Sequence, residues 1–227
     1  MSSSRKTAND FIKFIDYTYL DDSNDPNKFE HFLTNAASLE VASLCVYPEN
    51  IQRAHQRCPN HTLATVINYP SGDHSATKIN QDILLSTEAD ELDVVFPYSL
   101  YLSGNTKEAF KQMTAIINQR PNNKVIKVII ESGLYQNQQD ITKICKYLIK
   151  QPIHFIKTST GKISQGATLE AAKTILNVIK GTDKGLKVSG GISTLEQAKD
   201  YYELAEKTLA EPPSPSQFRI GASRALS

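Results

Sequence analysis

The feature that most constrains the fold of this chain is a regular alternation of short β-type runs with longer segments of helical period. Eight runs of four to seven residues, bounded by turn-forming or polar residues, are predicted strands. They are Phe14–Thr18, Val41–Tyr47, Thr62–Asn68, Glu91–Phe96, Val125–Ile130, His154–Thr158, Gly185–Ser189 and Phe218–Gly221. Strands that alternate with helices favour a parallel sheet with helices packed on it.

The segments between these runs carry apolar residues three or four positions apart, which is typical of one face of a helix. The clearest stripes are Ala109, Met113, Ile116 and Ile117; Ile141, Ile144, Cys145 and Leu148; and Leu169, Ala172, Leu176 and Ile179. Thr194 and Gln197 have the spacing of a capping box, which predicts the start of a helix that continues to about Leu209.

Eight strand–helix units predict an α/β fold of the (β/α)8, or TIM barrel, type. The alternative is an open parallel sheet with one strand miscounted. No G-x-G-x-x-G motif follows an early strand, which argues against a dinucleotide-binding sheet. The stretch EPPSPSQ, residues 211–217, is interpreted as the loop into the last strand, so residues 1–227 are expected to form a single domain.

The last unit is short, because only ASRALS follows Phe218–Gly221. The eighth helix is therefore expected to be short or missing. Either the N-terminal segment before Phe14 or a partner subunit would then cover that side of the barrel.

Composition narrows the classes of function. The formal net charge is +1, so no strong field attracts nucleic acid or an anionic membrane. The longest apolar runs, such as Val128–Ile130, are far too short to span a bilayer. No signal-peptide core follows the first residues, and three cysteines without close pairs argue against a disulfide framework and a zinc site. We expect a cytoplasmic protein with no metal, nucleic-acid or membrane partner.

Three ionisable residues in expected strands are the first candidates for chemistry: Asp93, Lys157 and Lys187. Lys187 follows Lys157 by 30 residues and Lys157 follows Asp93 by 64, about one and two strand–helix units, which predicts equivalent heights on strands four, six and seven. A lysine in a strand more often lies at a sheet edge, and an aspartate often ends a strand. A closed barrel has no edge, however, and buried charges need partners or a task.

Two lysines on adjacent strands suggest such a task. The pKa of a free lysine is about 10.4, so few lysines are neutral nucleophiles at pH 7. Two ammonium groups about 4 Å apart repel by roughly 4 kcal/mol at an effective dielectric constant of about 20, enough to bring one pKa near neutrality. The neutral amine could form an imine with a carbonyl, and Asp93 could transfer protons.

Glycine-rich turns indicate where an anion could bind. SGGIS follows the seventh strand, GAS follows the eighth, and Gly161 follows the sixth. Barrel enzymes often hold phosphate at this place with backbone N–H groups. HFIKTSTGK itself is not a P-loop, because Ile156 and Ile163 occupy positions that require Gly and Ser or Thr.

The segments ELDVVFPY, FIKTSTGK, KVSGG, FRIGAS, DYTYL and SLCVYP resemble those of the 2-deoxy-D-ribose-5-phosphate aldolase family, from about Phe11 to Ser223. The resemblance implies a class I aldolase on a (β/α)8 barrel that needs no metal or organic cofactor. The implied reaction is the reversible cleavage of 2-deoxy-D-ribose 5-phosphate to D-glyceraldehyde 3-phosphate and acetaldehyde. The implied partners are a small sugar phosphate and an aldehyde, and a homodimer is one expected assembly.

The resemblance also implies roles for individual residues. Lys157 would form the Schiff base, Lys187 would perturb Lys157 and help proton transfer, and Asp93 would relay protons. The residues expected around the phosphate are Gly161, Lys162, Gly190, Gly191, Gly221 and Ser223. Thr18 and Cys45 match positions near the substrate, and Asp16 matches a supporting polar position. A small buried hydrophobic side chain explains Cys45 equally well.

The chain departs from the family in two places. Family members often have an arginine where this chain has Ser193 in its phosphate segment, and Arg224 stands where they often have a small hydroxyl residue. We expect Arg224 to supply the missing cation; the alternative is a solvated arginine at a helix start. Some members also end in a tyrosine that assists proton transfer, and this chain ends at Ser227 without one. Turnover would then be slower, or water would take over that step.

Two other classes of function stay open. One is another imine-forming or isomerising barrel enzyme that acts on a different sugar phosphate. The other is a non-catalytic phosphosugar-binding relative, against which the presence of Asp93, Lys157 and Lys187 argues.

Overall fold

The computed structural model describes residues 8–223 except 24 and 122. Within this part of the chain, eight parallel strands form a closed barrel in sequence order. They are β1 (Ile15–Tyr19), β2 (Ser43–Val46), β3 (Leu63–Ile67), β4 (Glu91–Val95), β5 (Val125–Ile129), β6 (Phe155–Lys157), β7 (Gly185–Ser189) and β8 (Phe218–Ala222). Because β8 pairs with β1, Ile220 opposite Ile15, the open-sheet alternative is wrong and the TIM-barrel prediction is confirmed.

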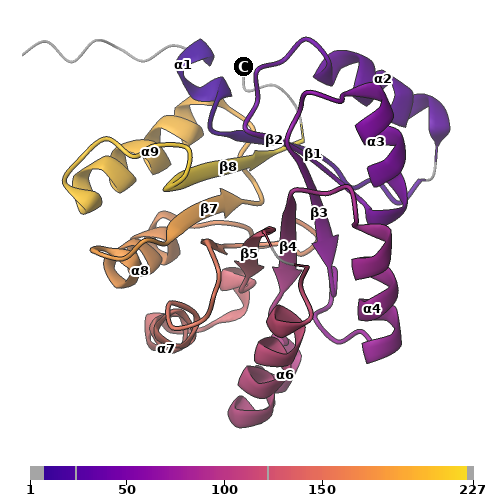
Figure 1. Cartoon of the computed structure of the whole chain (residues 1–227). Coiled ribbons are helices and arrows are strands. Elements are labelled where there is room, and N and C mark those ends of the chain that lie inside the picture. Colours follow the sequence, from indigo (N-terminus) through magenta and orange to yellow (C-terminus); the bar gives the residue numbers. More distant parts are fainter. Residues whose placement is uncertain (1–7, 24, 122, 224–227) are drawn as a thin grey trace, which may run out of the picture.

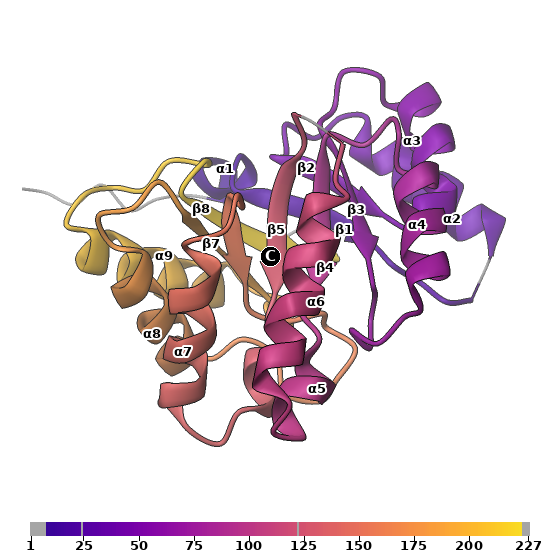
Figure 2. The same cartoon turned by 60° about the horizontal axis from the view of Figure 1, so that its bottom comes forward.

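Helices surround the strands, as Figures 1 and 2 show. On the right of Figure 1 lie α2 (Pro26–Ala36), α3 (Ile51–Arg57) and α4 (Ala76–Leu85), and on the left lie α7 (Gln138–Leu148), α8 (Leu169–Ile179) and α9 (Leu195–Leu209). Between these groups lies α6 (Thr106–Asn118), which follows the short α5 (Tyr98–Leu102). Short irregular loops connect most helices to the next strand.

Local sequence explains where these helices begin and which face they bury. The predicted stripe on α7 is wholly buried, and the Asn137 side chain accepts hydrogen bonds from the first N–H groups of that helix. Thr194 and Gln197 form the predicted capping box of α9. Leu169 is an exception to its stripe, with 46% exposure. It is the first residue of α8, and helical side chains lean toward the N-terminus, so it projects past the end of the helix.

The barrel separates two apolar regions. The larger one fills the space between strands and helices, because alternate strand residues such as Val94, Ile126 and Val188 point outward. A smaller one, the interior apolar cluster, lies inside the barrel. It consists of Cys45, Ala64, Val66, Tyr69, Val95 and Ile129. The interior also holds a group of charged side chains, which lies beneath the site described below.

The N-terminal segment packs on the barrel, as predicted. Phe11, in α1 (Ala8–Ile12), is 1% exposed, and its ring centroid lies 5.4 Å from that of Tyr202 on α9. Phe14 contacts both Tyr202 and Phe218 of β8. These rings cover the side of the barrel next to β8. The predicted short or missing eighth helix concerns residues after Ser223, which lie outside the described residues.

Among the described helices, none is both long enough and apolar enough to cross a membrane.

Candidate active site

The C-terminal ends of the strands surround a cavity of about 260 Å³. All strands are parallel, so these ends and the loops that follow them meet at one face of the barrel. The loops after β6, β7 and β8 supply most of the lining, and β1 and the loop after β3 supply the remainder. The site therefore lies on the face where barrel enzymes carry their chemistry.

Lys157 is the last residue of β6 and opens into this cavity. It is in register with Ile129 of β5 and with Lys187 of β7, so the two predicted lysines are direct neighbours in the sheet. Its side chain is only 4% exposed, and its Nζ lies 2.7 Å from Oδ2 of Asp93. The same oxygen accepts a hydrogen bond from Nζ of Lys187, also at 2.7 Å. One carboxylate oxygen thus joins both lysines.

Asp93 does not lie at the same height in the barrel as Lys157 and Lys187, so that part of the prediction is wrong. It pairs with Lys127 of β5, which pairs with Phe155 of β6, two residues before Lys157. The Asp93 side chain reaches both lysines across the barrel interior instead of along neighbouring strands.

Below the cavity the charged side chains form a buried ion network. Asp93 Oδ1 lies 3.0 Å from Lys127 Nζ, and Asp16 Oδ2 lies 3.0 Å from the same nitrogen and 2.5 Å from Lys187 Nζ. Glu91 also pairs with Lys127, and Arg219 pairs with Asp16 at 2.9 Å. The network has three carboxylates and four cations; its members are Asp16, Glu91, Asp93, Lys127, Lys157, Lys187 and Arg219.

This network perturbs its lysines in opposite directions. Burial lowers the pKa of Lys157; Asp93 opposes this effect, Lys187 adds to it, and the resulting pKa is below the ordinary lysine value. Burial also disfavours the charged form of Lys187, but Asp16 and Asp93 outweigh it and raise the pKa of that lysine. Lys157 is therefore the lysine most easily deprotonated. The direction agrees with the sequence argument, but burial, and not Lys187, is the largest cause.

Asp93 and Asp16 stay ionised despite their burial. Desolvation alone would raise the pKa of Asp93, but the ammonium groups of Lys127, Lys157 and Lys187 together hold it below its usual range. The pKa of Asp16 is likewise lowered, because its cationic neighbours outweigh desolvation. Asp93 is thus an ionised carboxylate in contact with the amine of Lys157.

Three glycines shape the cavity opposite Lys157. Gly161, Gly190 and Gly191 have φ values of 80°, 86° and 81°, a left-handed backbone that favours glycine. A side chain on Gly190 would come within 2.9 Å of the backbone of Gly166. None of the three glycine N–H groups donates to a residue in the described part of the chain. Such N–H groups can bind an anion.

Lys162 lies at the mouth of the cavity and is already paired. Its Nζ donates to the carbonyl of Leu20 at 2.8 Å and to Oδ2 of Asp22 at 2.7 Å. The hydroxyl of Tyr47 donates to the other oxygen of Asp22 at 2.5 Å. Any anion that binds Lys162 must therefore compete with Asp22.

The predicted site residues divide into three groups. Those that line the cavity are Thr18, Lys157, Gly161, Lys162, Gly190, Gly191, Gly221 and Ser223. Asp16, Asp93 and Lys187 lie beneath it in the ion network, and Cys45 belongs to the interior apolar cluster. Ser193 does not line the cavity, and its N–H donates to Gln197 Oε1 at 2.8 Å. Arg224 lies outside the described residues.

Several residues of the site were not predicted from the sequence. Lys127, Glu91 and Arg219 all lie in predicted strands, and Lys127 precedes Lys157 by 30 residues, the same interval that separates Lys157 from Lys187. That interval could have identified Lys127. Tyr69 lines the cavity, and its hydroxyl donates to the carbonyl of Thr160 at 3.1 Å. No pattern in the sequence indicated this contact.

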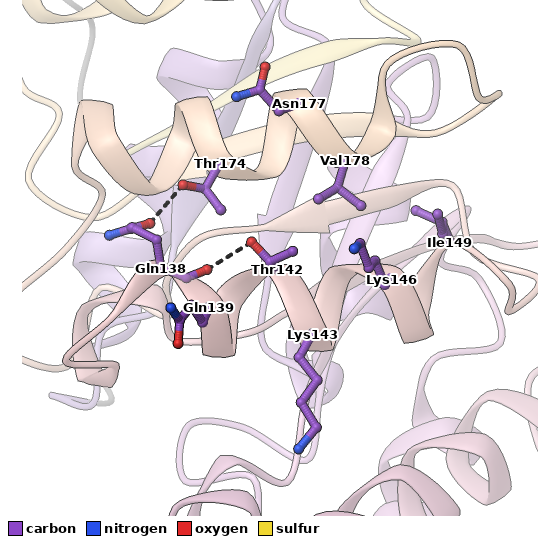
Figure 3. Close-up of a pocket in the computed structure, with 9 residues that line it drawn as sticks. All are labelled: Gln138, Gln139, Thr142, Lys143, Lys146, Ile149, Thr174, Asn177 and Val178. Atoms are coloured by element: carbon purple, nitrogen blue, oxygen red, sulfur yellow. Dashed lines mark hydrogen bonds between the residues drawn. The ribbon is translucent and has the colours of Figure 1, made fainter.

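A larger hollow, of about 790 Å³, lies on the outer surface between α7 and α8. Figure 3 shows Gln138 on α7 hydrogen-bonded to Thr174 on α8 within this hollow. Its described lining includes Lys143 and Lys146 but no carboxylate. The candidate active site is the smaller cavity, because it lies above the ion network and contains Lys157. No three acidic, His or Cys residues in the described ranges are arranged to hold a metal ion.

The family of the chain follows from comparison with known proteins. A model of the DeoC/LacD family aldolases matches residues 10–211. The chain belongs to the DeoC/LacD family of aldolases. The match includes the strands that carry Asp93, Lys157 and Lys187, whereas β8 lies beyond its end.

Solved structures of other aldolases have a similar fold. An aldolase called QR15 is 29% identical to this chain, with a TM-score of 0.82 over 94% of this chain and 91% of its own. A tetrameric deoxyribose phosphate aldolase from Aeropyrum pernix is 22% identical, with a TM-score of 0.77 over 96% of this chain and 89% of its own. The second likeness shows the fold alone.

Proposed function

We propose that this aldolase reversibly cleaves 2-deoxy-D-ribose 5-phosphate to D-glyceraldehyde 3-phosphate and acetaldehyde through a Schiff base on Lys157. The observation that carries the proposal is the state of this amine: it is buried, its pKa is lowered, and it opens into the cavity beside an ionised carboxylate. An amine that loses its proton more easily than an ordinary lysine suits imine formation, which requires the neutral nucleophile.

The proposed reaction begins when Lys157 Nζ attacks the C1 aldehyde of the sugar. Loss of water gives an iminium ion, which can accept electrons. Removal of the C3 hydroxyl proton forms the C3 carbonyl while the electrons of the C2–C3 bond move toward nitrogen. Glyceraldehyde 3-phosphate leaves, and an enamine remains on Lys157. Protonation of the enamine carbon and hydrolysis of the new iminium then release acetaldehyde and restore the amine.

Asp93 is the proposed proton carrier for these steps. Its Oδ2 contacts Nζ of Lys157, and its lowered pKa keeps it unprotonated between proton transfers. Lys187 keeps its own proton because its pKa is raised, so its proposed role is to hold Asp93 and to disfavour a second positive charge on Lys157. Two acidic partners, Asp16 and Asp93, compensate Lys187 itself.

The proposed phosphate site lies at the loops after β6, β7 and β8. Gly161, Gly190 and Gly191 offer backbone N–H groups, and Lys162 offers a cation once Asp22 releases it. Arg224 is proposed as a further cation. Arg224→Ala should raise the Michaelis constant for the phosphorylated sugar and leave that for 2-deoxyribose unchanged. An unchanged constant for both sugars would remove Arg224 from the phosphate site.

One trapping experiment tests the Schiff base and its substrate. The protein is incubated with acetaldehyde, or with 2-deoxyribose 5-phosphate, and reduced with borohydride, and the adduct is located by mass spectrometry. The adduct is expected on Lys157, and Lys162→Met, which changes the other lysine of the same segment, should still form it. A coupled assay for glyceraldehyde 3-phosphate then identifies the reaction.

The outcomes separate the alternative functions. An adduct on Lys157 without glyceraldehyde 3-phosphate would indicate an aldolase for another sugar phosphate. Interconversion of substrates without an adduct would indicate an isomerase. Binding of the sugar phosphate with neither outcome would indicate a non-catalytic relative.

The remaining proposals concern the cellular setting. Cys45, Cys58 and Cys145 are unpaired buried thiols, which fits a reducing compartment, and we assign the protein to the cytoplasm as one domain over residues 1–227. A homodimer is its proposed assembly, which sedimentation of the purified protein would test. The substrates are small molecules, and the proposed chemistry uses no metal or organic cofactor.

A further inference from the structure

Glu131 is a buried acid that belongs neither to the ion network nor to the cavity lining. It lies two residues after the end of β5, at the face of the barrel that carries the candidate active site, and its side chain is fully buried. Its backbone has φ 54° and ψ 57°, a left-handed conformation that is costly for a residue with a side chain. A buried carboxyl group and a strained backbone at one position both cost free energy, which indicates that Glu131 has a role that offsets this cost.

The carboxylate of Glu131 is bound by one residue of the β6 loop, Thr160. The Thr160 hydroxyl donates to Oε2 at 2.6 Å, and the Thr160 N–H lies 3.2 Å and 3.3 Å from the two carboxylate oxygens. The hydroxyl of Thr160 in turn accepts from the N–H of Lys162 at 3.1 Å. Glu131 therefore determines where the segment Thr160–Gly161–Lys162 lies.

The same turn contacts the β6 loop at a second place. A side chain on Gly133 would come within 2.3 Å of the carbonyl oxygen of Gln165, so the two backbones are in close contact there. Further along, Gly166 packs on Gly190 of the β7 loop equally closely. The β6 loop is thus held between the turn after β5 and the loop after β7, and its free side faces the cavity.

We infer that Glu131 is a positioning residue that fixes the β6 loop, and with it Gly161 and Lys162, at the distance from Lys157 that a phosphorylated substrate requires. The inference rests on the proposed function, because it assigns the phosphate of that substrate to this loop. Glu131 does not line the cavity, and its coulombic interaction with Lys157 is the smallest of the named effects on its own pKa. Its loss should therefore weaken binding of the phosphate and change the reactivity of the amine little.

The test compares substrates with and without phosphate. In Glu131→Gln, one oxygen still accepts a hydrogen bond but the charge and the second acceptor are lost. The Michaelis constant for 2-deoxyribose 5-phosphate should rise about tenfold, the usual effect of losing a hydrogen bond to a charged group. The constant for 2-deoxyribose and the rate of acetaldehyde trapping on Lys157 should stay within about twofold of the wild type.

Two further variants separate the carboxylate from the backbone. Glu131→Gly suits the left-handed backbone but removes the carboxylate, so it should show the same phosphate-specific defect without a loss of thermal stability. Thr160→Val removes the partner hydroxyl with little change of shape. In the double variant, Glu131→Gln should raise the Michaelis constant for the phosphorylated sugar almost no further than Thr160→Val does alone. Glu203→Gln, on the exposed face of α9, is the matched control and should change nothing.

The outcomes distinguish this inference from the proposed function. If the wild type forms no acetaldehyde adduct on Lys157, the proposed function is wrong. If the adduct forms but Glu131→Gln raises the constants of both sugars equally, or of neither, the positioning role is wrong. Should Glu131→Gln fail to fold, Thr160→Val and Glu131→Gly carry the same comparison, and phosphate-specific defects in both would support the inference.

Discussion

Two groups of side chains inside the barrel are stabilised in opposite ways. The interior apolar cluster, on β2 to β5 and the loop after β3, includes Ala64, Val66, Val95 and Ile129, all at most 2% exposed. The ion network takes its side chains from β1 and from β4 to β8, so β4 and β5 contribute to both groups. The apolar cluster gains free energy from removal of its surface from water, whereas the ion network must recover a large desolvation cost through pairing.

Within the ion network, the directions of the pKa shifts identify the amine that loses its proton most easily. Most network members have a pKa displaced toward the charged form, as in Asp16, Asp93, Lys127 and Lys187. Lys157 alone among the lysines of the network has a pKa displaced toward the neutral form. It contacts one carboxylate, Asp93, whereas Lys187 contacts two and Lys127 three. The number of carboxylate partners explains the difference.

The largest effect is expected from Lys157→Met. Turnover should fall by several orders of magnitude, because the methionine side chain has no amine to form the proposed Schiff base. Stability should not fall with it. The pKa of Lys157 is lower in the folded protein than the ordinary value of 10.5, so its charged form is disfavoured by folding at neutral pH. Thermal melting at pH 7 should show a midpoint at or above that of the wild type; a clearly lower midpoint would contradict this account.

Lys127→Met should have the largest effect on stability. Lys127 is fully buried and contacts Asp16, Glu91 and Asp93, so its removal leaves buried carboxylates without their shared cation. The expected loss is about 3–5 kcal/mol in the free energy of unfolding. Urea unfolding measures this loss, with the exposed Lys146→Met on α7 as the control. Equal stability of both variants would mean that Lys127 is not needed to compensate the carboxylates.

The pH dependence of imine formation tests the electrostatic causes separately. The rate of acetaldehyde trapping on Lys157 should rise with pH and level off above the lowered pKa, because only the neutral amine attacks. Asp93 raises this pKa and Lys187 lowers it. Asp93→Asn should therefore move the rising limb to lower pH, and Lys187→Met should move it to higher pH. Shifts in the same direction would show that these two charges do not set the nucleophile's pKa.

Ile129→Val in the interior apolar cluster should have the smallest effect. It removes one methylene group from a fully buried side chain that neighbours Lys157 in register. The expected cost is about 0.5–1.5 kcal/mol in the free energy of unfolding, and the pH range over which the trapping rate rises should not change. Urea unfolding and the trapping profile check both expectations together. A shift in that pH range would mean that packing, as well as charge, controls the pKa of Lys157.

Much of the fold could be predicted because its determinants are local. The eight strand runs, the stripe on α7 and the capping box of α9 follow from periodicity and from residue types a few positions apart. Lys157 and Lys187 could be placed on neighbouring strands from their spacing alone, which the register bears out. Leu169 was misassigned because it lies at the very start of α8, where a stripe no longer faces the barrel.

The sequence by itself therefore determined the strands, the helices and the adjacency of two lysines, since each depends on residues close together in the chain. Only the tertiary structure decided that Lys127 and Lys187 are fully compensated while Lys157 is not, and that Glu131 holds Thr160. The physical reason is that desolvation and Coulomb energies depend on distances across the closed barrel. Those distances join strands far apart in sequence, and no local pattern encodes them.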